Sequence, residues 1–539
     1  MSARVEPTAI EMSVGEIPPA APLSTASAPT SASRDPQVIL EVRDLRTYFF
    51  TYDGIVRALD GVNLKVRRGE TTGLVGETGC GKSVTAFSIT RLIADPPGRI
   101  VSGSVRLGSA NLLWGLEEEA KFRRDPKTDR VRIRRSFRRI KQANDRMGAV
   151  RGRRIAMIFQ EPSQAMNPIF SISNQISESL LLHRGIEVVD GMLGATLDEP
   201  AVEAACEALA QVVANDEPSR LRAACTAVGD AAHLPTLGYE LYHELRPMNL
   251  APEQAAKEIH AIVARRRLSP GQRRYLLHRR RLMETEERQR AISIHEMEVG
   301  QRETMARIAV NNSRRRERLS HFYYRIWGIR SRVRHPLDRE TFWRTVSLLE
   351  GVSIASPVQI ARGYPHELSG GMLQRVMIAM ALSTDPDVLI ADEPTTALDV
   401  TIQAQILALM RNLKERVGTA IVLITHDLAV IAEVADRVNV MYAGRIVESA
   451  PVRELFRRPL HPYSQGLLAS IPHLERPEKE LASIPGSVPN LLRPPSGCRF
   501  HPRCAYAMPI CSQQEPPITN EGPGHTVACY LYKGPVATE

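Results

Sequence analysis

The sequence predicts an α/β fold, and three features of the chain support that prediction. A short apolar segment at residues 72–75 runs directly into a glycine-rich loop, and a helical pattern follows over about residues 82–93. Two further apolar runs, at residues 387–391 and 420–424, have the length and composition of strands buried in a parallel sheet. A strand, a glycine-rich loop and a helix in this order are the setting in which a phosphate-binding loop is expected.

Length and composition limit the class of protein before any motif is considered. The chain has 539 residues, 43% hydrophobic and 24% charged, so a wholly disordered or fibrous protein is excluded. At about 150 residues per domain, this length predicts three or four domains. No segment approaches about 18 uncharged apolar residues, and the N-terminus lacks a basic start followed by an apolar run. We therefore expect neither a transmembrane helix nor a secretory signal, and we expect the protein to stay in the cytosol.

The first part of the chain predicts a tail followed by strands. Residues 1–36 are rich in Pro, Ala, Ser and Thr without an apolar period, so they predict a disordered tail. Residues 38–42 and 62–66 predict strands, the second because apolar and polar residues alternate in it. The helix after the glycine-rich loop is expected to end before Pro96, where two prolines and a glycine follow each other.

Two basic segments interrupt this pattern and account for the positive net charge of +10. Residues 117–154 have 15 basic and 6 acidic side chains, and residues 265–334 have 20 arginines and 7 acidic residues. The first insertion, at about residues 117–150, is poorly periodic, whereas the second, at about residues 186–339, has a mostly helical pattern. Such segments bind nucleic acid, anionic lipid or an acidic protein surface, or they are solvated helical faces.

A phosphate-binding loop is the strongest chemical signal in the chain. Residues 76–83 match G-x-x-x-x-G-K-[ST], in which glycines let backbone N–H groups turn towards phosphate oxygens at the positive end of a helix. Lys82 is expected to reach the β- and γ-phosphates, and Ser83 to bind Mg²⁺. The residues expected to contact ATP in and beside the loop are Gly76, Glu77, Thr78, Gly79, Cys80, Gly81, Lys82, Ser83 and Val84.

Cys80 stands within this loop, at the start of the helix and beside Lys82. That position predicts a lowered thiol pKa and makes a redox switch conceivable. The simpler interpretation is that a small residue is tolerated there.

A pair of acidic residues ends the strand expected at residues 387–391. Asp392 is expected to hold the metal through water, and Glu393 is placed to act on the attacking water as a general base. A solvated turn would also explain two adjacent acidic residues, but the phosphate loop in the same chain favours the catalytic interpretation.

Together with further short motifs, these residues resemble the motif set of ATP-binding cassette (ABC) ATPases. The other matching positions are Gln160 of the glutamine loop, residues 368–375 of the signature motif (LSGGMLQR), Asp399 of the D-loop and His426 as the switch histidine. The resemblance implies a P-loop ABC cassette over residues 37–460, with a RecA-like core, an antiparallel β subdomain and a helical subdomain.

The resemblance also implies a mechanism in which two cassettes face each other. ATP lies between the phosphate loop of one cassette and the signature motif of the other, so part of each site serves the partner's nucleotide. Gln160 and His426 would sense the γ-phosphate, and Gln160 would bind Mg²⁺ and relay closure to a membrane subunit. The implied residues are Glu393, His426, Lys82 and Gln160 for catalysis; Ser83, Gln160 and Asp392 for Mg²⁺; Ser369, Gly370, Gly371 and Gln374 for the partner's ATP; and Phe50 or Tyr52 for adenine.

Segments after the cassette resemble one family of importers, the oligopeptide and dipeptide importer ATPases. Residues 461–468 (HPYSQGLL), 484–489 (IPGSVP) and 494–498 (PPSGC) carry this resemblance. Members import peptides, and some import nickel or sugars. The implied partners are two membrane permease subunits, a second related ABC ATPase or a second copy of this chain, and an extracytoplasmic solute-binding protein. The implied location is peripheral, on the cytoplasmic face of the inner (plasma) membrane.

Four of the seven cysteines lie in the small Pro-rich region at residues 461–539. Cys498, Cys504, Cys511 and Cys529 have the spacing C-x5-C-x6-C-x17-C, and four thiolates can hold an iron–sulfur cluster or one zinc ion. Paired C-x2-C motifs are absent, which weakens the zinc interpretation. Some importer ATPases of this family carry a [4Fe-4S] cluster at such cysteines, so the resemblance implies a cluster. Zinc and unliganded thiols remain alternatives.

The chain departs from the family between Gln160 and Ser369, where residues 186–339 are inserted. Both basic insertions flank the helical subdomain that is expected to touch the permease. The runs Arg279–Arg281 and Arg314–Arg316 would attract lipid phosphates at the inner leaflet, so anionic lipid is a further candidate partner.

Two other classes of function remain as alternatives to an importer subunit. A soluble cassette ATPase could act on nucleic acid through the Arg-rich insertions. Translation-type relatives carry two cassettes, however, and repair-type relatives carry long coiled coils, whereas residues 186–339 lack sustained heptads. A non-catalytic regulatory cassette is disfavoured by the intact Glu393 and His426. Nucleic acid is therefore an unfavoured partner.

Overall fold

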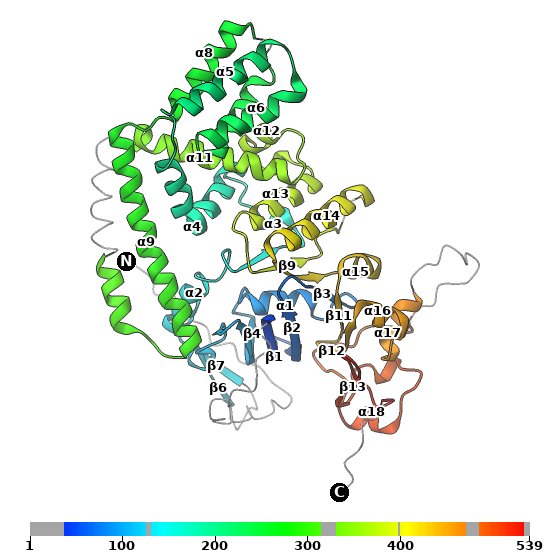
Figure 1. Ribbon diagram of the computed structural model, residues 1–539. Coiled ribbons are helices and arrows are strands. Elements are labelled where there is room, and N and C mark those ends of the chain that lie inside the picture. The colour runs from blue at the N-terminus through cyan, green and yellow to red at the C-terminus, as the bar shows by residue number, and fades with distance from the viewer. Residues whose placement is uncertain are drawn as a thin grey trace, which may run out of the picture.

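A mixed sheet forms the centre of the molecule (Figure 1). The computed structural model describes residues 37–124, 131–248, 250–313, 330–396, 399–470 and 484–532, and the tail expected at residues 1–36 lies outside this part. The strands of this sheet are β3 (Thr71–Val75), β8 (Ile155–Ile158), β9 (Val388–Asp392), β10 (Ala420–Ile424), β11 (Arg437–Tyr442), β12 (Arg445–Pro451), β13 (Ile518–Gly522) and β14 (His525–Ala528). Their spatial order is β13-β14-β12-β11-β3-β10-β9-β8. The strands β8, β9, β10, β3 and β11 run parallel, and β12, β14 and β13 continue the sheet antiparallel.

A second, antiparallel sheet lies beside the first, as expected for a β subdomain. Its order is β2-β1-β4-β5, with β1 (Val38–Thr51), β2 (Gly54–Arg67), β4 (Gly98–Leu107) and β5 (Ala110–Asn111). The strands predicted at residues 38–42 and 62–66 are confirmed, and both extend well beyond the predicted segments. The extension is possible because β1 pairs on both of its sides, with β2 and with β4.

The central strands are buried on both faces, which explains their continuous apolar composition. In β9, Leu389 and Ala391 pack into a core shared with α13 (Gly370–Leu382) and α14 (Val400–Val417). Their neighbours Val388 and Ile390 point to the opposite face, into a core shared with the antiparallel sheet. Helices α1 (Lys82–Ile89), α15 (Leu428–Val434), α16 (Val452–Arg457) and α17 (Pro462–Ala469) complete the nucleotide-binding part.

In the residues that the structure describes, the long insertion consists of helices joined by short turns. It leaves the core along α4 (Ile172–Leu193), which follows the short α3 (Pro162–Ala165) and has a non-helical residue at Arg184. The helices that follow are α5 (Pro200–Ala214), α6 (Pro218–Ala231), α7 (Pro235–Leu245), α8 (Pro252–Arg266) and α9 (Pro270–Val299). Each of these five has a proline in its first turn, where the missing N–H removes no helical hydrogen bond. The chain returns through α11 (Arg330–Gly351), α12 (Pro357–Arg362) and the 3-10 turn η2 (Pro365–Glu367).

The insertion has a core and an ion network of its own. Leucine, isoleucine and valine side chains of α5 to α8 form a separate cluster. Between these helices, Arg266 donates to Glu240 at 2.6 Å and to Glu340 at 2.8 Å, and all three side chains are nearly inaccessible to solvent. Buried charges persist only when paired, so part of the arginine content of this segment is structural. The run Arg314–Arg316 lies outside the described residues.

The first basic insertion forms a hairpin and a helix, which its weak periodicity did not predict. The elements are η1 (Leu116–Glu118), β6 (Ala120–Arg124), β7 (Val131–Arg135) and α2 (Phe137–Met147). Ion pairs connect this insertion to the segment after α1. Arg91 pairs with Glu119, and Asp95 pairs with Arg135 at 2.7 Å. The end of α9 meets the turn between β4 and β5, since Ser109 donates to Glu298 at 2.6 Å.

The C-terminal region packs against the nucleotide-binding part. The strand β14 pairs with β12 and joins the central sheet, while η3 (His501–Arg503) and α18 (Pro509–Gln513) lie beside it. The buried Glu448 of β12 accepts hydrogen bonds from the backbone N–H groups of Leu460 and His461 and lies 2.8 Å from His525. These contacts fix the start of the region against the sheet.

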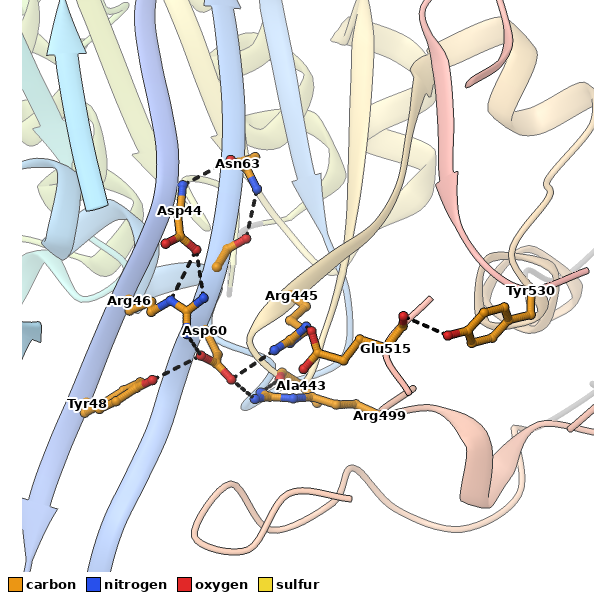
Figure 2. A network of polar contacts seen from close by, with 11 residues as sticks. Asp44, Arg46, Tyr48, Asp60, Asn63, Ala443, Arg445, Arg499, Glu515 and Tyr530 are labelled. Atoms are coloured by element: carbon orange, nitrogen blue, oxygen red, sulfur yellow. Dashed lines mark hydrogen bonds and ion pairs between the residues drawn. The ribbon is translucent and has the colours of Figure 1, made fainter. Parts of the chain in front are cut away.

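A buried carboxylate joins the C-terminal region to the antiparallel sheet (Figure 2). Asp60 of β2 is 5% exposed and accepts hydrogen bonds from Arg499, from Arg445 at 3.1 Å, from Arg46 at 3.2 Å and from Tyr48 at 3.0 Å. Burial alone would raise the pKa of Asp60, but the three guanidinium groups outweigh it and hold the pKa below its usual value. Asp60 is therefore ionised at neutral pH and connects three segments that are distant in the sequence.

We expect Asp60→Asn to lower the melting temperature of the full-length chain by about 5 °C at neutral pH, because three arginines lose a shared charged partner. Since the pKa of Asp60 is lowered in the folded state, its stabilising effect is present above the unfolded pKa and is lost as pH falls. The difference between wild type and variant should therefore shrink below about pH 4. Thermal melts followed by circular dichroism across this range measure it.

Asp44→Asn is the matched control, since Asp44 pairs with Arg46 at the surface and its side chain is 61% exposed. Such pairs contribute about 0–1 kcal/mol, so little change is expected. Equal losses for both variants would contradict a special role for the buried charge.

Candidate active site

The functional motifs meet at the carboxyl ends of four neighbouring parallel strands. The phosphate loop follows β3, His426 follows β10, Glu393 follows β9 and Gln160 follows β8. These strands stand in the order β3-β10-β9-β8, so residues more than two hundred positions apart reach one edge of the sheet. Ligands of open α/β sheets bind at this edge.

The phosphate loop is shaped by glycines in conformations that other residues avoid. Gly76 has a φ of 156°, and a Cβ there would lie 2.1 Å from the carbonyl oxygen of Met441. Gly81 has a φ of 108° and directly precedes α1. Lys82 is 6% exposed and its Nζ donates to the carbonyl oxygens of Gly76 at 2.7 Å and Glu77 at 3.1 Å. Its ammonium group is therefore held across the loop.

Two of the residues predicted to bind Mg²⁺ touch each other. Ser83 Oγ donates to Asp392 Oδ1 at 3.1 Å. Asp392 is 1% exposed, and burial raises its pKa to about 6 against the opposing effect of the Ser83 hydrogen bond. Hydroxyl and carboxylate oxygens are the ligands that Mg²⁺ prefers, so this pair fits that ion. The amide of Gln160, the third predicted ligand, is directed to Glu393 instead.

Glu393 is the centre of a polar cluster. Its carboxylate accepts from Gln160 Nε2 at 2.9 Å and from Thr396 Oγ1 at 3.0 Å, and it lies 3.1 Å from His426 Nδ1. Its backbone has a positive φ of 47°, and its N–H donates to the carbonyl of Ile424. Burial would raise the pKa of Glu393, but the hydrogen bonds from His426 and Thr396 outweigh it and lower the pKa. The carboxylate is therefore ionised and oriented, as a general base requires.

Thr396 was not among the residues that the sequence predicted. It belongs to no motif used there, and its role is visible only because the turn after β9 places its hydroxyl on Glu393.

The signature residues divide into two groups. Ser369 caps the N-terminus of α13 and accepts from the N–H of Met372, and both Ser369 and Gly370 are exposed. These two residues are accessible to a partner, as predicted sites for its nucleotide should be. Gln374 is instead 3% exposed and donates to the carbonyl of Pro394 at 2.8 Å. In this chain its side chain supports the turn after Glu393, and its contact with the partner's ATP stays a prediction.

Asp399 of the predicted D-loop caps α14, because its carboxylate accepts from the N–H of Ile402 at 2.9 Å. The preceding residues 397 and 398 lie outside the described part of the chain.

The two aromatic residues predicted for adenine have different surroundings. Phe50 is 9% exposed and its ring packs against Phe122 of the first insertion, with ring centroids 6.0 Å apart. Tyr52 is 87% exposed. Of the two, only Tyr52 presents an uncovered ring, and the assignment stays a prediction.

The expected lowering of the Cys80 pKa is wrong. Cys80 is inaccessible to solvent, and burial raises the pKa of its thiol despite the nearby ammonium group of Lys82. A buried neutral thiol is a poor nucleophile, so the interpretation as a tolerated small residue is favoured over a redox switch.

The four C-terminal cysteines come together around one pocket. Cys498, Cys504, Cys511 and Cys529 all line it, with Phe500 among the surrounding residues. None of these four cysteines forms a disulfide. Within the described residues, no three Cys, His, Asp or Glu side chains converge closely enough to hold a single metal ion.

Comparison with known proteins identifies the family. The model of the ABC transporter family matches residues 59–396, and that of the oligopeptide/dipeptide transporter C-terminal region matches residues 447–511. This chain belongs to the ATP-binding proteins of ABC transporters, in the oligopeptide/dipeptide transporter family. As an ABC transporter ATPase, it couples ATP hydrolysis to transport.

Relatives of this ABC ATPase match along nearly its whole length. The probable peptide ABC transporter ATP-binding protein y4tR of Sinorhizobium fredii is 33% identical over 92% of this chain and 95% of its own length. The oligopeptide transport ATP-binding protein AppD of Bacillus subtilis is 33% identical over 92% and 97%. OppD of Salmonella typhimurium is 31% identical over 94% and 98%. In the described part of this ATPase, no helix has the length and apolar character needed to cross a membrane.

We expect Glu393→Gln to lower the turnover number for ATP at least about 100-fold, because the amide cannot accept the proton of the attacking water. The amide has nearly the same shape, so the dissociation constant for ATP should change less than about twofold. Steady-state hydrolysis and equilibrium nucleotide binding on the full-length chain measure both quantities.

Glu415→Gln makes the same chemical change at an exposed position of α14 and should retain wild-type turnover. Turnover by Glu393→Gln at the wild-type rate would remove Glu393 from the mechanism.

Proposed function

We propose that this chain is the ATP-hydrolysing subunit of an ABC importer for di- or oligopeptides. One observation carries the catalytic part: Lys82, Asp392, Glu393, Gln160 and His426 lie together at the ends of four adjacent parallel strands. The peptide substrate is supported by the C-terminal family match and by the names of the relatives. Nickel or sugars are the alternative substrates, since the chain itself does not select the solute.

Each residue has a role that its contacts support. Lys82 would bind the β- and γ-phosphates of ATP, and Ser83 and Asp392 would hold Mg²⁺, which would neutralise phosphate charge. Glu393 takes the proton of the attacking water at its carboxylate, and His426 and Gln160 orient that carboxylate. Thr396 belongs with them, because its hydroxyl holds the same carboxylate oxygen as Gln160.

The exposed signature residues support a paired arrangement of cassettes. Ser369, Gly370 and Gly371 would bind the nucleotide of a second ABC ATPase, identical or related, and their own nucleotide would meet the partner's signature. Two permease subunits and an extracytoplasmic solute-binding protein complete the complex, with this chain on the cytoplasmic face of the inner membrane.

The arginine-rich helices do not favour a function on nucleic acid. Several of these arginines are used within the chain: Arg266 with Glu240 and Glu340, Arg280 with Asp190, and Arg307 with Glu296. Arg273, Arg274 and Arg281 on α9 are exposed, and exposed guanidinium groups of this kind would attract anionic lipid.

We further propose that the four-cysteine pocket holds a [4Fe-4S] cluster. The donor set fits, because four thiols line one pocket and thiolates are the usual ligands of such clusters. The C-x5-C-x6-C-x17-C spacing lacks the paired C-x2-C motifs that are usual for structural zinc. Zinc and unliganded thiols are the outcomes that would replace this proposal.

The importer proposal predicts the composition of the native complex. Tagged full-length chain, extracted from its own membranes in mild detergent, should retain two permease subunits and a second ABC ATPase in mass spectrometry. Recovery of the chain with nucleic acid and without permeases, bound in a salt-dependent manner, would replace the importer with the nucleic-acid alternative.

The cluster proposal predicts bound iron in anaerobically purified protein. Cys504→Ser should remove the brown colour and most of the iron, because one of four ligands is lost. Cys206→Ser, a buried cysteine in the separate core of α5, is the matched control and should retain iron. Wild-type protein that contains zinc or no metal would overturn the proposal.

A further inference from the structure

An arginine of the C-terminal region reaches into the phosphate loop. Arg503 ends η3 and directly precedes Cys504, yet its guanidinium group forms two parallel hydrogen bonds with Glu77, the second residue of the loop. Nη1 donates to Oε2 at 2.7 Å, and Nη2 donates to Oε1 at 3.0 Å. The Arg503 side chain is 6% exposed and that of Glu77 is 29% exposed. This is a shielded, two-pronged ion pair between residues 426 positions apart.

Glu77 is also held through its backbone. Its N–H donates to the hydroxyl of the buried Tyr463 at 2.8 Å, and its carbonyl accepts from Lys82 Nζ at 3.1 Å. The residue that receives Arg503 therefore positions the lysine of the phosphate loop. Tyr463 belongs to α17, so a second contact from the segment after the cassette fixes the same residue.

The negative charge of Glu77 would affect the binding of ATP. A carboxylate in the loop repels the polyanionic ATP that the loop binds, and the repulsion is strong where solvent is partly excluded. Arg503 neutralises the carboxylate and holds it by two hydrogen bonds, and further contacts fix Arg503 itself. Its Nε donates to the carbonyl of Pro485 at 2.8 Å, and its guanidinium lies 5.8 Å from the ring centroid of Tyr442.

We propose that Arg503 is a positioning residue for ATP: it neutralises Glu77 and holds the Glu77 peptide so that Lys82 is placed for the phosphates. The C-terminal region thereby contributes to nucleotide affinity in its own cassette. Arg503 does not contact the reacting atoms, so its effect falls on KM for ATP and on the dissociation constant more than on turnover.

A double-mutant cycle on the full-length chain separates this role from a general effect on folding. Arg503→Ala should raise KM for ATP about tenfold, the size expected for a charge-assisted pair, with kcat within about twofold of wild type. In a Glu77→Gln background the carboxylate charge is absent, and the same substitution should raise KM less than about twofold. Arg503→Lys keeps the charge but not the paired donors, so its KM should lie between those of wild type and Arg503→Ala.

Arg499→Ala is the comparison variant within the same region. Arg499 also follows a pocket cysteine directly, but it contacts Asp60 and the carbonyl of Ala443, not the phosphate loop. Its KM for ATP should stay within about twofold of wild type, whatever its effect on melting temperature.

Equal rises in KM for Arg503→Ala in both Glu77 backgrounds, or an equal rise for Arg499→Ala, would overturn the proposal in favour of a purely structural role. If Arg503→Ala does not fold, the cycle is run with Arg503→Lys, and a KM unchanged by that variant in both backgrounds would overturn the proposal. Equilibrium binding of a fluorescent ATP analogue gives the same comparison without turnover. A failure of the Arg503 proposal can therefore be distinguished from a failure of the catalytic assignment of Glu393.

Discussion

The pairing of β9 between β8 and β10 is the constraint on which the active site depends. Glu393 follows β9, Gln160 follows β8 and His426 follows β10, so the three side chains can meet only if these strands stay in register. The turn after β9 adds a second requirement, because the N–H of Glu393 is bonded to Ile424 and its φ is positive. A shift of one residue would turn Glu393 away from its partners.

The large insertion does not disturb the pairing of β8 with β9, because most of its helices pack against one another. The chain between the neighbouring strands β8 and β9, which contains the insertion, is more than two hundred residues long. Helices α5 to α8 have their own apolar core, and the buried Arg266 is neutralised by Glu240 of α7 and by Glu340 of α11, next to the end of the insertion. Because these helices bury their apolar side chains in a core of their own, β8 and β9 still pair directly.

The sequence predicted those parts of the molecule that require particular residue types at fixed spacing along the chain. The phosphate loop, the apolar strands and the motif residues were recognisable because each requires particular residue types at fixed spacing. The direction of the Cys80 pKa shift was wrong because burial decides it, and no spacing of residues reports burial. The hairpin of β6 and β7 was missed because its basic strands alternate weakly. Thr396 bonds to Glu393 three positions away within one turn, and Arg503 bonds to Glu77 across 426 positions; neither residue belongs to a motif whose spacing could predict the contact.

The C-terminal region is packed firmly against the nucleotide-binding domain, because two of its arginines form ion pairs with different parts of that domain. Arg499 follows Cys498 and binds Asp60 beneath the antiparallel sheet, while Arg503 precedes Cys504 and binds Glu77 in the phosphate loop (Figure 2 shows the first contact). The two arginines stand four positions apart, and the short turn η3 ends at Arg503. The backbone beside the cysteine pocket is therefore held at two separate points of the nucleotide-binding domain, one on the antiparallel sheet and one on the phosphate loop.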